Sequence, residues 1–95
     1  MEGGEEAELD GFSALVVNSP ILPSQLGNAI VKKGYDLGIT WAHSSDVIKV
    51  SLRSNKDGNV HVVEFSKKYG GGGHKSAAGF IIENEEKFPW KVKNT

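Results

Sequence analysis

The stretch DLGITWAHSSDVIKVSLRS, residues 36–54, alternates apolar and polar side chains on both sides of a Ser-Ser pair. Such alternation is typical of β-strands with one buried face, and it predicts two strands joined as an antiparallel hairpin. A turn at Ser44-Ser45 pairs apolar residues with one another: Trp41 with Ile48, Ile39 with Val50, and Leu37 with Leu52. On the polar face, the same register places Asp36 opposite Arg53.

Segments with strand and helix patterns flank this hairpin. Residues 12–18 are a short apolar run that predicts a first strand, and residues 77–83 predict a strand that returns to the sheet. Helices are expected at 24–33 and 60–69, each with lysines near its end and a glycine after it. The order β-α-β-β-α-β predicts a single small α/β domain over residues 11–84, with a mixed β-sheet flanked by two helices.

Both ends of the chain differ from this domain in composition. Residues 1–10 contain five acidic residues and no basic one, which predicts a disordered acidic tail. Residues 85–95 include Phe-Pro-Trp and are expected to form an irregular tail. From Gly11 onward, eleven basic and seven acidic residues remain, and this balance permits anionic ligands.

The composition excludes several classes of protein. The sequence contains no cysteine, so it has no disulfide, thiolate metal site or cysteine nucleophile. No apolar run approaches the ~20 residues of a membrane-spanning helix, and the acidic start is unlike a signal or transit peptide. We therefore expect an intracellular, cytoplasmic protein with no membrane partner.

Four consecutive glycines, Gly70–Gly73, precede His74-Lys75-Ser76. Ordering four glycines costs much backbone entropy, so such a run is expected where side chains would obstruct a ligand or where positive φ is needed. Successive backbone N–H groups can bind an anion, and the run predicts a phosphate- or carboxylate-binding loop, with a flexible turn as the alternative. It is not a Walker A loop, because His74 replaces a required glycine. It is not a dinucleotide-binding turn, because a helix precedes it.

Four side chains are candidates for binding an anion. His74 can donate a hydrogen bond to a phosphate oxygen, and Lys75 and Ser76 add a positive charge and a hydroxyl. The guanidinium of Arg53 suits phosphate or carboxylate, but a cross-strand ion pair with Asp36 would explain this residue equally well. The three histidines fit no compact ligand set, and no catalytic carboxylate pair or Ser-His-Asp arrangement is recognisable. We therefore expect no metal site or cofactor in this chain.

The strings VSLRS, residues 50–54, and KYGGGGHKSAAGF, residues 68–80, resemble the C-terminal, DHH-associated domain of the Asp-His-His (DHH) phosphoesterases. That family includes RecJ-like single-strand exonucleases, nanoRNases and cyclic-dinucleotide phosphodiesterases, and a related domain ends alanyl-tRNA synthetases. The resemblance implies a mixed-sheet α/β domain that holds the substrate. It further implies that Gly71, Gly72, Gly73 and His74 contact the substrate's phosphate or terminal nucleotide, while Arg53 helps to clamp it.

In this family, hydrolysis belongs to an N-terminal domain whose Asp and His residues bind two manganese or magnesium ions, and this sequence offers no matching set. We therefore expect a binding module for short single-stranded RNA or DNA, or for a nucleotide, without catalysis of its own. One alternative is a subunit or fragment of a manganese-dependent phosphoesterase or exonuclease that works with a separate DHH catalytic domain. The other is a protein-interaction remnant that has lost its ligand.

Overall fold

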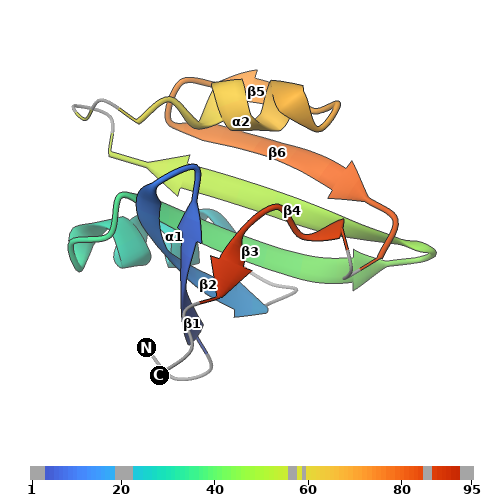
Figure 1. Ribbon diagram of the computed structural model, residues 1–95, viewed down its shortest axis with the longest axis horizontal. Coiled ribbons are helices and arrows are strands. Elements are labelled where there is room, and N and C mark those ends of the chain that lie inside the picture. The colour runs from blue at the N-terminus through green and yellow to red at the C-terminus, as the bar shows by residue number, and fades with distance from the viewer. Residues whose placement is uncertain (1–3, 19–22, 56–57, 59, 85–86, 93–95) are drawn as a thin grey trace.

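The computed structural model of the protein describes residues 4–18, 23–55, 58, 60–84 and 87–92. In these residues it shows one seven-stranded sheet and two helices (Figure 1). The strands are β1 (Gly4–Leu9), β2 (Phe12–Asn18), β3 (Leu37–Ser44), β4 (Val47–Ser54), β5 (Gly72–His74), β6 (Ala77–Ile82) and β7 (Lys91–Val92). The helices are α1 (Pro23–Lys32) and α2 (Val62–Lys68).

The strand order in the sheet is β5-β6-β4-β3-β2-β1-β7. β2 and β3 are parallel, whereas the other neighbouring strands are antiparallel. A helix, α1, connects the two parallel strands, because the chain must cross back to the starting end of the sheet before it can run in the same direction again. The predicted α/β class, with a mixed sheet and two helices, is therefore confirmed.

The two helices lie on opposite faces of the sheet. On what we call the α1 face, α1 packs on β3 and β4, and Ile30 lies in a buried cluster with Leu15 and Val17. On the other side, the α2 face, α2 packs on β4, β5 and β6, and Phe65 joins the main core with Leu52. Figure 1 shows α2 lying along β5 and β6 at one end of the molecule. The exposed end of the α1 face over β5 and β6 is where the candidate site lies.

The β3–β4 hairpin has the predicted faces but a different register. β3 ends at Ser44 and β4 begins at Val47, so the turn is Ser45-Asp46, one residue later than predicted, and each residue of β3 pairs with a partner two positions later. Trp41 therefore lies opposite Val50 and Ile39 opposite Leu52, while Leu37 lies opposite the polar Ser54. A shift of two residues keeps every side chain on its predicted face, because side chains alternate with a period of two.

This register separates Arg53 from Asp36. Gly38 lies opposite Arg53, so the prediction that Asp36 pairs across the strands with Arg53 is wrong. The Asp36 carboxylate instead accepts hydrogen bonds from the backbone N–H and the hydroxyl of Ser13, at 3.0 and 3.2 Å. The Asp36 N–H donates to the Ser13 hydroxyl at 3.1 Å, so Asp36 joins the start of β3 to β2.

Part of the predicted acidic tail is a strand. β1 covers Gly4–Leu9 and places Ala7 and Leu9 in the core, both fully buried. The Asp10-Gly11 turn to β2 has positive φ at both residues, 51° and 90°, as two-residue hairpin turns of this kind require. The prediction of disorder for residues 1–10 is therefore wrong for 4–10, because alternate residues of β1 complete the core.

The predicted irregular tail at residues 85–95 also contributes to the core. Trp90 is buried, and its ring stacks on Phe88 with the ring centroids 4.3 Å apart. Phe88 in turn contacts Trp41, at 5.0 Å between ring centroids. β7 then pairs with Ala7–Glu8 of β1. The described part of this tail therefore docks against the α2 face and is not wholly irregular.

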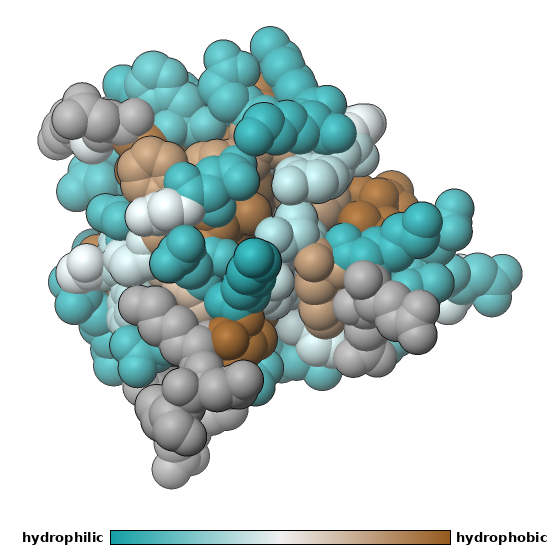
Figure 2. Space-filling view, in the orientation of Figure 1, coloured by the Kyte–Doolittle hydropathy of each residue, from teal (hydrophilic) through white to brown (hydrophobic). Residues whose placement is uncertain are grey.

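The surface shows the balance expected of a small folded domain. In the view of Figure 2, hydrophobic residues form separate areas among hydrophilic ones. Within the described residues, neither helix is long and apolar enough to span a bilayer.

Candidate functional site

The glycine run begins as the end of α2. The Gly70 N–H donates to the carbonyl of Lys67 at 3.2 Å, and the Gly71 N–H donates to the carbonyl of Ser66 at 2.8 Å. Gly70 has a φ of 84°, the left-handed conformation that commonly ends a helix. The amides of Gly70 and Gly71 therefore bond to the end of α2, and β5 pairs with β6 along one edge. The other edge of β5 has no neighbouring strand among the described residues, and N–H groups on that edge can face a ligand.

The residues after the glycines are tied to two other elements. The carbonyl of Lys75 accepts a hydrogen bond from the N–H of Val62, the first residue of α2, at 2.8 Å. The carbonyl of Ser76 accepts one from the N–H of Ser54, the last residue of β4, at 3.0 Å. The Lys75 side chain is exposed, and Ser76 is half-buried. The predicted loop is thus an ordered edge strand held at both ends, in contrast to a flexible turn.

An ion pair holds the end of α2 that leads into the glycines. Lys68 Nζ donates a hydrogen bond to the Asp10 carboxylate at 2.9 Å, which connects α2 to the β1–β2 turn. This hydrogen bond and the carboxylate's negative charge raise the pKa of Lys68. Because both side chains are exposed to solvent, the pair contributes little to the stability of the fold and mainly positions the helix end.

The three glycines predicted to contact a ligand have different surroundings. A Cβ at Gly71 would collide with the Gly79 carbonyl and lie 2.8 Å from Phe80 Cα. At Gly73, φ is 142°, and a Cβ would lie 2.5 Å from Ala78 Cα. At Gly72, a Cβ would meet nothing within 4 Å. Close packing against β6 explains why positions 71 and 73 must be glycine. At Gly72, the open space leaves room for a molecule to approach the backbone.

Arg53 and His74 share the α1 face of the sheet. Ala77 of β6 pairs with Arg53 on one side and with His74 on the other, and directly paired residues project from the same face. Two strand spacings separate the backbones of Arg53 and His74, roughly 10 Å in all. The methyl group of Ala77 fills little of the space between them. The structure therefore brings together the two side chains that sequence analysis favoured most.

α1 and two glycines accommodate the Arg53 side chain. A Cβ at Gly27 of α1 would collide with Arg53 Cγ, and one at Gly38 of β3 would lie 2.7 Å from the Gly27 carbonyl oxygen. A glycine inside a helix costs about 1 kcal/mol relative to alanine, and the close approach of α1 to Arg53 explains its use here. Arg53 is half-buried and its Nε is buried, so its charge is partly shielded from water.

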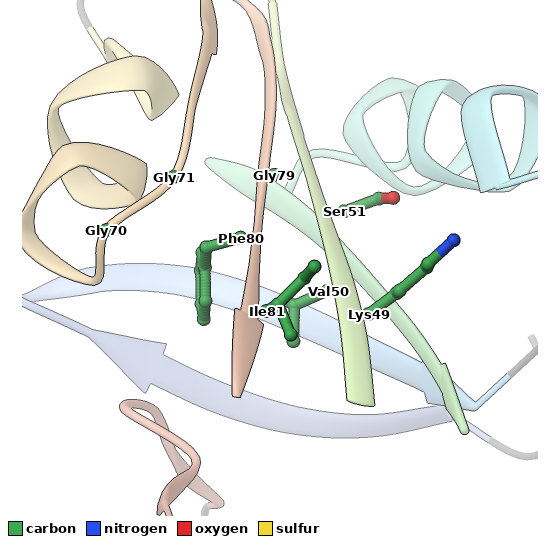
Figure 3. Close-up of a pocket in the computed structure, with 8 residues that line it drawn as sticks. All are labelled: Lys49, Val50, Ser51, Gly70, Gly71, Gly79, Phe80 and Ile81. Atoms are coloured by element: carbon green, nitrogen blue, oxygen red, sulfur yellow. The ribbon is translucent and has the colours of Figure 1, made fainter. Parts of the chain in front are cut away.

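A hollow of about 360 Å³ lies farther along β4 and β6 than this pair of side chains, and its lining includes Lys49, Ser51, Gly79 and Ile81. Figure 3 shows β6 passing between Gly70–Gly71 on one side and Lys49 and Ser51 on the other. Gly79 of β6 lies between these two walls, and Ile81 follows two residues later. No role for this hollow was predicted from the sequence, although a glycine inside a strand pattern is a known sign of close approach by another group.

The structure gives no compact set of metal ligands in its described residues. No group of three or more histidine, aspartate or glutamate side chains lies close enough together there to hold a metal ion. His43 is at the end of β3, His61 precedes α2, and His74 is on β5.

Comparison with known proteins identifies the family. Residues 17–93 match the DHHA1 domain, and the chain therefore belongs to this family. This finding confirms the resemblance to DHH-associated domains inferred from the glycine and arginine strings. Among curated protein sequences, no significant match is found.

Several solved structures have a similar fold. An uncharacterized protein from Helicobacter pylori G27 is 28% identical with a TM-score of 0.69, covering 83% of this chain and 22% of that one. The pGpG-specific phosphodiesterase PggH from Vibrio cholerae is 14% identical with a TM-score of 0.60, covering 84% of this chain and 30% of that one. The C-Ala domain of Aquifex aeolicus alanyl-tRNA synthetase is 19% identical with a TM-score of 0.61, covering 90% of this chain and 88% of that one. The chain thus spans less than a third of the first two proteins.

Proposed function

We propose that this protein is a binding module for the phosphate groups of short single-stranded nucleic acids or nucleotides. The observation that carries this proposal is the placement of Arg53 and His74 on one sheet face, on either side of Ala77. Membership of the DHHA1 family supports it, as do similar folds in a pGpG-specific phosphodiesterase and in a domain of alanyl-tRNA synthetase.

In this proposal, two different donors approach one phosphate from β4 and β5, the strands on either side of β6. The Arg53 guanidinium offers two parallel N–H donors, and partial burial strengthens its attraction for an anion. The exposed His74 imidazole donates from the opposite side, and the open backbone at Gly72 lets the anion come close. The exposed Lys75 and the half-buried Ser76 add charge and a hydroxyl at the end of β5.

A titration of fluorescently labelled trinucleotides at low salt, followed by anisotropy, tests this proposal. We expect the His74→Ala/Arg53→Ala double variant to bind roughly 50-fold more weakly than the wild type, because two charge-assisted hydrogen bonds are lost. A Gly72→Ala variant should bind several-fold more weakly, because its methyl group enters the open space while touching nothing in the folded protein.

The matched control is a His61→Ala/Lys91→Ala double variant. It removes one histidine and one cation from exposed positions on other elements, so it changes the charge comparably but leaves the candidate site intact. Its affinity should stay within about twofold of the wild type. Equal binding by the wild type and the His74/Arg53 variant would show that the phosphate lies elsewhere. Absence of binding by the wild type would instead favour a protein-interaction role.

A second proposal follows from the lengths of the related structures. Because the chain corresponds to 22% and 30% of two of them, we propose that it works beside a separate DHH catalytic domain, which supplies the hydrolytic chemistry. We expect the purified 95-residue chain to leave a labelled trinucleotide intact in the presence of Mn²⁺, as seen by gel electrophoresis. Manganese-dependent cleavage that is lost in the His74→Ala variant would contradict this division of labour.

A further inference from the structure

The hollow beside Gly79 lies on the same sheet face as the candidate phosphate site. Antiparallel pairing sets Ser51 opposite Gly79 and Gly79 opposite Gly72, two positions along the strands from Arg53, Ala77 and His74. Lys49 opposite Ile81 forms the next pair. Each step of two residues along a strand is ~6.6 Å, so the hollow begins about this distance from the Arg53–His74 pair, which is short enough for the sugar of one nucleotide to bridge.

The walls of the hollow combine an apolar surface with polar groups on one side. Its floor is the bare backbone at Gly79, and the backbone of Gly70–Gly71 bounds it at the sheet edge. Ile81 supplies an apolar side chain that is 56% exposed. On the β4 side, Ser51 and Lys49 add a hydroxyl and an ammonium group, and their side chains point the same way in Figure 3.

We infer that this hollow binds the base of the nucleotide whose phosphate lies between Arg53 and His74. This inference rests on the proposed function and adds to it a contact with the base. A nucleobase is flat, with apolar faces and a polar edge. Its face can lie against Ile81 and the bare Gly79 backbone while its edge meets Ser51 and Lys49. The volume of about 360 Å³ is at the lower end of the range for ligand pockets and suits a single base.

Glycine at position 79 is part of this arrangement. A Cβ there would lie 2.7 Å from the Val50 carbonyl oxygen, so β6 and β4 already require glycine at this point. The same absence of a side chain leaves the floor of the hollow flat.

Ile81 and Val92 are the large hydrophobic residues that the described part of the structure leaves exposed, at 56% and 40%. Of these two, Ile81 borders the hollow and Val92 lies on β7.

Two-dimensional ¹H–¹⁵N NMR titrations with ribose 5-phosphate and with AMP test the inference. Both ligands should shift the His74 amide signal, because both carry the phosphate. AMP alone should also shift the Gly79 and Ile81 signals, and it should bind about tenfold more tightly, because the base covers apolar surface that the sugar phosphate leaves exposed. In an Ile81→Ser variant, the affinity for AMP should fall to near that for ribose 5-phosphate, which should itself be unchanged.

The matched control is Val92→Ser, which replaces an exposed hydrophobic residue outside the hollow and should change neither affinity. If Ile81→Ser disturbs the fold, Lys49→Ala at an exposed position provides the same comparison. Equal binding of AMP and ribose 5-phosphate by the wild type would overturn the base subsite while leaving the phosphate site intact. If neither ligand shifts His74, the proposed function fails and the base subsite fails with it.

Discussion

Replacement of Gly73 by alanine is expected to lower the free energy of unfolding by about 3 kcal/mol. Gly73 has a φ of 142°, a backbone conformation that residues other than glycine rarely adopt. A Cβ there would lie 2.5 Å from Ala78 Cα and 2.6 Å from the Ala77 carbonyl oxygen. These neighbours are backbone atoms of β6, so they can move only if the β5–β6 pairing is distorted. The midpoint of thermal unfolding should fall by about 15 °C, measured by circular dichroism.

Gly72→Ala is the matched control for this effect. The two residues are adjacent on the same edge strand, but a Cβ at Gly72 meets nothing within 4 Å. Its free energy of unfolding should therefore change by less than about 0.5 kcal/mol. Equal destabilisation by the two substitutions would contradict the description of β5 as an ordered strand in contact with β6.

Replacement of Trp90 by alanine is expected to lower the free energy of unfolding by about 3–5 kcal/mol. The side chain is 6% exposed and lies in the main core, where it stacks on Phe88. Its loss would leave a cavity against the α2 face and remove the stacking on Phe88, next to the start of β7. Urea denaturation followed by far-ultraviolet circular dichroism measures the effect without depending on tryptophan fluorescence.

Val92→Ala serves as the comparison for Trp90. Val92 is also in the C-terminal segment but is 40% exposed, so its truncation should cost less than about 1 kcal/mol. If Trp90→Ala unfolds at the same urea concentration as the wild type, the C-terminal segment does not contribute to the core.

The faces of the central hairpin could be predicted from sequence, but its register could not. Alternation between residues 37 and 54 fixes which side chains are buried, and a shift of two residues leaves that pattern unchanged. Only the turn distinguishes the two registers, and here Ser45 adopts a φ of 55°, which the Ser44-Ser45-Asp46 sequence does not specify. The predicted pairing of Asp36 with Arg53 depended entirely on which of these two registers was assumed.

The N-terminal strand was predictable in principle. Asp10-Gly11 is a strong signal for a two-residue hairpin turn, and Ala7 and Leu9 alternate with glutamates before it. The high local charge favoured a disordered tail in the sequence analysis, but two buried side chains on one face are enough for a strand that pairs along its whole length with β2. Tertiary burial therefore outweighed composition.

The candidate site was predictable in part, because its two principal side chains lie within recognisable strings. The sequence singled out Arg53 and His74, while their shared face depends on the register of three strands around Ala77. The role of Gly27 in making room for Arg53 depends on where α1 crosses β4. The hollow at Gly79 arises from residues of two strands and the end of α2, and no single stretch of sequence contains it.

The pairing of β7 with β1 has a consequence for how the chain folds. It joins Ala7 to Val92, whereas the β3–β4 hairpin closes between Ser44 and Val47. The entropy lost on closing a loop grows with its length, and contacts between distant residues slow folding. The central hairpin can therefore form early, while the sheet gains its last strand only after most of the intervening chain is in place. Until then, the glutamate-bearing edge of β1 is open to solvent, and its charges oppose pairing with other chains.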